Sequence, residues 1–105
     1  MSKLEILDSL RKLSRQIMPG GSKVYLYGSQ ARGDEREDSD WDVLILLDKD
    51  NVDAEDKDRY GYPFFELGWE VNAEIHPSVY SLRKWNKHDV SPEFMDNVER
   101  DKIVI

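Results

Sequence analysis

Apolar positions near the N-terminus recur three or four residues apart, which is the period of one face of a helix. Ser2 and Glu5 stand before this stripe with the spacing of a capping box, and Pro19-Gly20-Gly21 follows it. We therefore expect an amphipathic helix between these two signals. Its apolar stripe consists of Ile6, Leu7, Leu10, Leu13, Ile17 and Met18.

Two short apolar runs in the first half predict strands. Residues 24–27 read VYLY and stop at a Gly-Ser pair, after which residues 30–32 suit one helical turn that ends at Gly33. Residues 43–47 read VLILL and are apolar on both faces, which is typical of a central strand.

The pattern is weaker after residue 47. Residues 48–58 are polar and predict a connecting loop. The next stretch, DRYGYPFFELGW, suits a short helix begun near Pro63, although its two glycines weaken that prediction. Residues 69–76 read WEVNAEIH and alternate between apolar and polar side chains, so we expect the third strand there.

Short elements complete the predicted fold. Ser81 suits the cap of a short helix through Trp85, Ser91-Pro92 suits the start of another, and residues 103–105 suit a small edge strand. We expect one α+β domain over residues 1–105. It would have a small mixed sheet of three core strands and a possible edge strand, with helices packed on one side.

Composition narrows the classes of protein that fit. The 105 residues include no cysteine, which excludes disulfides and thiolate metal sites and fits a reducing compartment. The N-terminus does not read as a signal peptide, and no apolar run approaches the roughly 20 residues that span a bilayer. We therefore expect a cytoplasmic protein with no membrane contact.

The charge is unevenly distributed. The formal net charge is −7, and residues 34–58 hold 12 acidic but only 3 basic side chains. A protein that binds long nucleic acids needs a basic face for phosphate contacts. Long RNA or DNA is therefore not an expected partner.

Two carboxylates, Asp40 and Asp42, stand where the acidic segment meets the apolar strand. Strand residues two apart point to the same side, with Cα atoms about 6.5 Å apart. Two unit charges at that separation repel by roughly 2.5 kcal/mol at an effective dielectric of 20. A divalent cation such as Mg²⁺, which binds one or two carboxylates together with substrate phosphates, reverses this penalty. Considered alone, the pair would also suit a solvated acidic loop.

The Gly-Ser pair that ends the first strand suits a phosphate site. Gly28 lets a phosphate approach the backbone, Ser29 adds a hydroxyl donor, and the following helical turn presents free N–H groups. Arg32 would neutralise further phosphate charge, or it would pair with Glu35 or Asp38.

These features occur together in GSQARGDEREDSDWDVLILL, which resembles the signature of the minimal nucleotidyltransferases within the polymerase-beta-like superfamily. That signature runs Gly-Ser-x-Ala-Arg-Gly, a loop, then Ser-Asp-x-Asp before an apolar strand. The matching residues are Gly28, Ser29, Ala31, Arg32, Gly33, Ser39, Asp40 and Asp42.

The resemblance implies a magnesium-dependent transfer of a nucleoside monophosphate, AMP from ATP in the first instance, to a hydroxyl with release of pyrophosphate. Asp40 and Asp42 would hold two Mg²⁺ ions, and Gly28-Ser29 would bind the β- and γ-phosphates. Two such ions stabilise the entering and leaving oxygens of an in-line displacement.

The resemblance also implies a third carboxylate, often within Val-Asp-Leu on the next strand, that holds one ion and acts as base. Here the corresponding segment reads VNAEIHP. Asn72 aligns most simply with that position, Glu74 is our preferred candidate for a catalytic metal ligand, and Glu70 is a weaker one. The alternative is that no base is present. We expect His76 and His88 to be surface or capping residues and not ligands or bases.

Small members of the family often act beside a helical HEPN protein, as the antitoxin of a toxin–antitoxin pair. The resemblance therefore implies a HEPN-type partner or a homo-oligomer. The alternative is a catalytically weak or inactive protein that binds nucleotide, metal or a partner protein.

Overall fold

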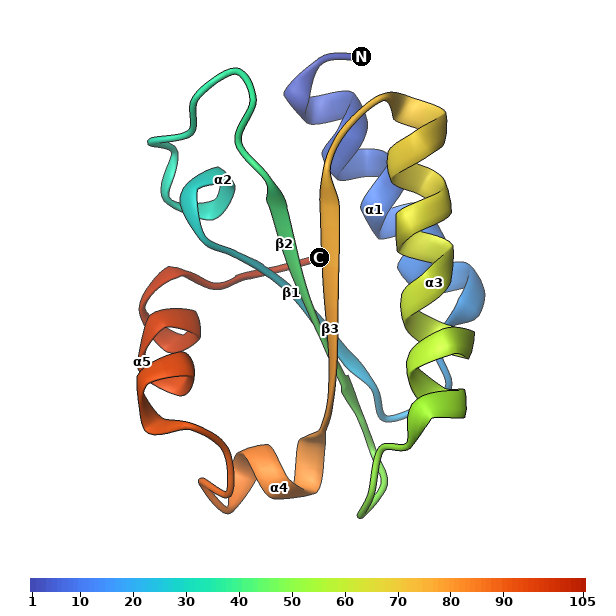
Figure 1. Ribbon diagram of the computed structural model, residues 1–105, viewed down its shortest axis with the longest axis vertical. Coiled ribbons are helices and arrows are strands. Elements are labelled where there is room, and N and C mark those ends of the chain that lie inside the picture. The colour runs from blue at the N-terminus through green and yellow to red at the C-terminus, as the bar shows by residue number, and fades with distance from the viewer.

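The computed structural model describes residues 1–105, and its fold is the α+β class predicted from the sequence. Figure 1 shows one sheet with helices on both sides. In chain order the elements are α1 (Lys3–Ile17), β1 (Lys23–Tyr27), α2 (Ser29–Arg32), β2 (Trp41–Leu47), α3 (Ala54–Val71), β3 (Ile75–Ser81), α4 (Leu82–Asn86), α5 (Pro92–Asp101) and β4 (Ile103–Val104).

The sheet has four strands in the order β3-β2-β1-β4. β1 runs antiparallel to β2 and β4, whereas β2 and β3 are parallel, so the sheet is mixed as expected. β2 is central and is buried without interruption from Val43 to Leu47, which confirms the interpretation of VLILL. β4 pairs at the outer edge of β1, as predicted for the C-terminal residues.

Helices cover both faces of the sheet, because alternate residues of β2 enter two separate cores. Val43 and Ile45 pack with residues of α1 and α3. Leu44 and Leu46 pack on the opposite face with residues of α4 and α5. The expectation that the helices pack on one side of the sheet is therefore wrong. α1 and α3 cover one face, and α4 and α5 cover the other.

The predicted helix boundaries are confirmed where capping residues mark them. The Ser2 hydroxyl accepts a hydrogen bond from the Glu5 N–H at 3.2 Å, and the reciprocal bond completes a capping box. Ser81 caps α4 through the Lys84 N–H, and Pro92 is the first residue of α5.

The largest difference from the sequence prediction lies in α3. Asp53 and Asp56 form a second capping box, so a helix begins inside the segment expected to be a loop and continues to Val71. The strand predicted over residues 69–76 is therefore wrong: the first part of that segment is the last turn of α3, and β3 occupies Ile75–Ser81.

The buried face of α3 does not appear in the sequence as a row of apolar side chains, because it includes glycines. The buried residues Gly61, Phe64, Gly68 and Val71 are spaced three or four apart, but two of the four have no side chain. A Cβ on Gly68 would lie 2.7 Å from the Ala73 carbonyl oxygen, so the helix packs too closely for any larger residue.

None of the helices has both the length and the apolar composition needed to cross a membrane.

Candidate functional site

Three strand ends meet at one end of the sheet, where β1 ends and β2 and β3 begin (Figure 1). Tyr27, the last residue of β1, pairs with Asp42, and Asp42 pairs on its other side with His76. The Gly-Ser pair follows Tyr27 directly. The register therefore brings the predicted phosphate loop and the predicted carboxylates to the same place.

Asp40 and Asp42 stand on either side of a tryptophan that fixes the start of β2. Trp41 is only 4% exposed and packs in the core beneath α1 and α3. Burial raises the pKa of the Asp42 carboxyl, and repulsion from Asp40 adds to this effect, while His76 and Arg32 oppose it. Burial and the nearby Asp40 therefore both disfavour the ionised form of the Asp42 carboxyl.

Gly28 forms the side of the site opposite β3. Its backbone has φ +77° and ψ −162°, a region that is essentially restricted to glycine. A Cβ here would overlap the Oδ2 atom of Asp42, so the strand–helix junction lies directly against that carboxylate. α2 begins at Ser29 without a side-chain cap from Gly28, which leaves its first N–H groups available to an anion.

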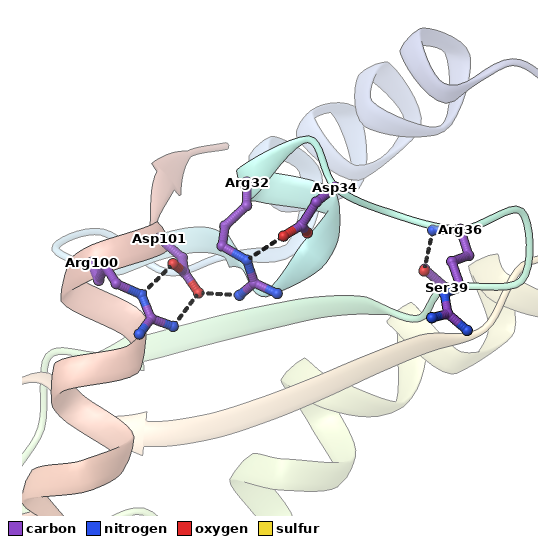
Figure 2. A network of polar contacts seen from close by, with 6 residues as sticks. All are labelled: Arg32, Asp34, Arg36, Ser39, Arg100 and Asp101. Atoms are coloured by element: carbon purple, nitrogen blue, oxygen red, sulfur yellow. Dashed lines mark hydrogen bonds and ion pairs between the residues drawn. The ribbon is translucent and has the colours of Figure 1, made fainter.

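The acidic loop before β2 is held by two polar contacts. The buried Gln30 side chain donates a hydrogen bond to the Ser39 carbonyl at 3.2 Å. The Ser39 hydroxyl in turn accepts the Arg36 N–H at 2.7 Å (Figure 2). Sequence analysis missed the role of Gln30, whose only signal is its place between Ser29 and Ala31. Ser39, a signature residue, shapes the turn that delivers Asp40.

Arg32 is part of an ion-pair network that Figure 2 shows between α2 and α5. Its guanidinium bonds to Asp34 at 3.1 Å and to the buried Asp101 at 2.7 Å, and Arg100 bonds to Asp101 at 2.9 Å. Neither of the pairs expected as alternatives, with Glu35 or Asp38, forms. Arg32 therefore connects α2, in the predicted phosphate loop, to the C-terminal helix α5.

None of the three candidates for the third carboxylate position lies on a strand, and Glu74 directly precedes β3. Glu70 is an exposed residue in the last turn of α3. Asn72 is the C-cap of α3 with φ +56°, a left-handed conformation that asparagine tolerates well and that ends the helix. The expectation of a strand over these positions was wrong because WEVNAEIH combines a helix end with the start of a strand.

Glu74 and His76 lie beside the aspartates. The Trp41 N–H donates to the Glu74 carbonyl at 2.8 Å, which aligns Glu74 with Asp40. His76 Nε2 lies 3.0 Å from Glu74 Oε2 and 3.9 Å from Asp40 Oδ1. His76 is a surface residue, as expected, and the parallel register places it opposite Asp42.

Comparison with known proteins identifies the family. A model of the family described as "Nucleotidyltransferase domain" matches residues 4–102. The chain belongs to the nucleotidyltransferase family. A proposed protein adenylyltransferase of Methanocaldococcus jannaschii is 31% identical over 100 residues, which cover 94% of each protein.

Two solved structures resemble this nucleotidyltransferase in fold. One contains a tri-AMPylated Shewanella oneidensis HEPN toxin in complex with MNT antitoxin; the match has a TM-score of 0.64 and 17% identity and covers 98% of this chain and 71% of that one. The other is described as a proposed minimal nucleotidyltransferase; it has a TM-score of 0.60 and 19% identity and covers 100% of this chain and 97% of that one.

The donor atoms at this end of the sheet fit the divalent cations that nucleotidyl transfer implies. Carboxylate oxygens of Asp40 and Glu74 lie within 4.8 Å of each other and suit hard cations, whereas Asp42 is outside this group and its carboxylate lies against Gly28. Tyr27 packs beside Asp42, and its own raised pKa, caused chiefly by burial, keeps the phenol neutral. The residues present therefore suit metal ions bound with a nucleotide phosphate.

Proposed function

We propose that this nucleotidyltransferase transfers AMP from ATP to a hydroxyl group of a partner protein, with Mg²⁺ as the metal. The observation that carries the proposal is the contact between the Gly28 backbone and the Asp42 carboxylate, which unites a phosphate loop and an acidic site. Neither feature alone distinguishes a nucleotidyltransferase from other folds.

In this proposal Gly28 and Ser29 bind the β- and γ-phosphates. The positive-φ glycine allows close approach, and the uncapped start of α2 supplies N–H donors next to the Ser29 hydroxyl. Arg32 contributes positive charge at the far side of α2, although its bonds to Asp34 and Asp101 restrict its reach. We assign it a positioning role alongside its electrostatic one.

Asp40 and Asp42 hold the metal in this proposal, with Glu74 as the third carboxylate. Bound Mg²⁺ would neutralise charge on the transferring phosphoryl group and on the leaving pyrophosphate. Glu74 would accept the proton of the attacking hydroxyl. Its carboxylate is 74% exposed and lies at the outer strand of the sheet, where an acceptor protein has access.

Exposed aromatic residues on α3 support a protein as the acceptor. Tyr62, Phe65 and Trp69 are 48%, 43% and 68% exposed. Tyr62 and Phe65 also line a groove of about 480 Å³ together with Val79 and Tyr80 of the outer strand. Exposed apolar groups that gather around a groove are typical of an interaction surface. The HEPN toxin in the Shewanella oneidensis complex makes a helical HEPN-type protein our preferred partner.

One observation favours a second function, a nucleotide-binding protein with little or no catalytic activity. The strand beside Asp42 carries His76 at the paired position in place of a carboxylate, and Glu74 is held by that histidine. Such a protein would bind Mg-ATP and a partner without releasing pyrophosphate.

Label transfer distinguishes the two functions. The chain would be incubated with Mg²⁺, α-labelled ATP and a HEPN-type protein encoded beside it in the genome. We expect label on the partner from α-labelled ATP and none from γ-labelled ATP. Asp42→Asn should abolish transfer, whereas Asp96→Asn, an exposed control on α5, should not. Binding of Mg-ATP without label transfer would overturn the catalytic proposal and support the binding protein.

A further inference from the structure

His76 occupies a position in the site that the carboxylate assignments leave unexplained. Its side chain leaves β3 on the face opposite to the buried Ile75, so it points toward the same side of the sheet as Asp42. One donor atom from each of Asp40, Glu74 and His76 lies within 4.8 Å of the other two. His76 lies on β3, and Asp40 and Glu74 are the residues directly before β2 and β3, which pair in parallel register.

The backbone beneath this cluster is held by strand pairing and by buried neighbours, although the three side chains are exposed. Trp41 and Ile75 pair directly in the parallel register and are 4% and 3% exposed. The hydrogen bond from the Trp41 N–H to the Glu74 carbonyl extends the pairing by one residue beyond the strand. Small rotations of the three side chains are therefore sufficient to change the distances between their donor atoms.

We infer that His76 Nε2 is a metal ligand, and that with Asp40 and Glu74 it forms a mixed nitrogen–oxygen site for a divalent transition-metal ion. The inference deepens the proposed function and rests on it for one point, the metal at Asp40. Asp40 would belong both to the pair with Asp42 and to the pair with Glu74. It assigns to His76 the place beside Asp42 on β3.

The donor distances match such a site. Ligands bound at about 2.0–2.2 Å around a tetrahedral or octahedral ion lie roughly 3–4 Å from one another. The His76 nitrogen is 3.0 Å from the Glu74 oxygen and 3.9 Å from the Asp40 oxygen. On the other side of Asp42, the absence of a Cβ at Gly28 lets the Asp42 carboxylate lie against the backbone.

A surface ion pair between Glu74 and His76 is the simpler alternative. Both side chains are at least half exposed, and pairs of this kind contribute little stability. A protonated His76 would pair with Asp40 as well as with Glu74, but this alternative predicts no preference among metals. A nitrogen ligand does predict one, because imidazole favours Zn²⁺ and related ions over Mg²⁺.

The test uses the metal alone, without ATP or acceptor. The chain contains only two histidines, His76 and His88, so nitrogen NMR of the imidazole rings reports each separately. Saturating Zn²⁺ should shift the Nε2 resonance of His76 and leave His88 unchanged. A His76 resonance that stays in place at saturation would overturn the inference.

Matched variants provide a second readout by calorimetry. His76→Asn should weaken Zn²⁺ binding at least about tenfold and Mg²⁺ binding less than about twofold. His88→Asn is the control, because His88 has φ +58° and asparagine tolerates that conformation. Equal Zn²⁺ affinity in the two variants would contradict the inference. Failure of AMP transfer leaves both metal measurements intact, so the two proposals fail separately.

Discussion

The start of β2 and the start of β3 face the same site but hold their polar side chains in different ways. At β2, Asp42 stands between the buried Trp41 and Val43, and Gly28 packs against its carboxylate. At β3, Glu74 and His76 are exposed and contact each other. Both backbones are held by the core and by strand pairing, but the Asp42 carboxylate is also packed against Gly28, whereas the Glu74 and His76 side chains are held only by their contact with each other and with Asp40.

This difference indicates a division of roles. Groups that must stay in a fixed geometry while charge develops gain from a rigid, partly dry setting. Groups that contact a changing partner gain from exposure and freedom to rotate. We therefore expect substitutions around Asp42 to affect catalysis and folding, and substitutions around His76 to affect metal choice and acceptor use with little effect on folding.

The largest effect should come from Asp42→Asn. Loss of a metal-binding carboxylate removes several kcal/mol of transition-state stabilisation, so AMP transfer should fall at least about a hundredfold. The metal-free protein should not lose stability. Because the folded-state pKa of Asp42 is raised above 3.8, its ionised form destabilises the fold at neutral pH, and the neutral amide removes that cost.

Melting temperatures at pH 7 and near pH 3 check the sign. The variant should melt above the wild type at pH 7, and the gap should close in acid as Asp42 becomes protonated. A variant that melts lower at pH 7 would contradict the electrostatic part of the account.

Gly28→Ala should have the next largest effect. The backbone conformation at Gly28 costs about 1–3 kcal/mol for a residue with a Cβ, and that Cβ also meets Asp42. Gly33→Ala is the matched control, since Gly33 also has positive φ but its Cβ would meet nothing within 4 Å. Denaturant unfolding and Mg-ATP titration should show a larger loss in both quantities at Gly28. Equal losses in the two variants would remove Gly28 from the phosphate site.

Asp101→Asn tests the ion pairs that connect the proposed phosphate loop to α5. Hydrogen bonds to charged groups contribute about 1.5–3 kcal/mol, so the free energy of unfolding at pH 7 should fall by about 1.5 kcal/mol. Arg100, and then Arg32, lower the pKa of Asp101 below its ordinary 3.8. The stabilisation is therefore complete above pH 3.8 and is lost as pH falls through the folded-state pKa. Urea unfolding at pH 7 and near pH 2 measures it, and a pH-independent difference would contradict the ion-pair assignment.

The smallest effect on folding should come from His76→Asn. Its ring is half exposed and its ion pair lies at the surface, so unfolding free energy should change by less than about 0.5 kcal/mol. Chemical denaturation measures this directly. A loss of unfolding free energy as large as that of Gly28→Ala would show that the start of β3 is stabilised in the same way as the start of β2.

The first half of the fold was predictable because its signals are local. The capping box at Ser2, the Gly-Ser pair and the VLILL strand each lie within a few residues of the structure they specify. Gly28 lies beside Asp42 because β1 and β2 are consecutive antiparallel strands and Tyr27 pairs with Asp42. The same reasoning predicted that Asp40 and Asp42 present their carboxylates together; Asp40 precedes β2 and groups with Glu74 and His76, so the shared site with Asp42 stays a prediction.

The second half was not predictable in the same way because its signals depend on packing. Gly61 and Gly68 form part of the buried face of α3, where only contact with β3 and the following turn explains their small size. Without that contact, Trp69–Val71 resembles a strand. Because β3 begins later than predicted, the sequence did not show that His76 lies opposite Asp42. The parallel register of β3 with β2 places it there.

A crystal structure with Mn²⁺ and a non-hydrolysable ATP analogue would test the central claim most directly. We predict anomalous density for the metal in contact with the carboxylates of both Asp40 and Asp42, with the analogue's β- and γ-phosphates on the Gly28-Ser29 backbone. Metal density away from this pair, or a triphosphate bound elsewhere on the protein, would contradict the account.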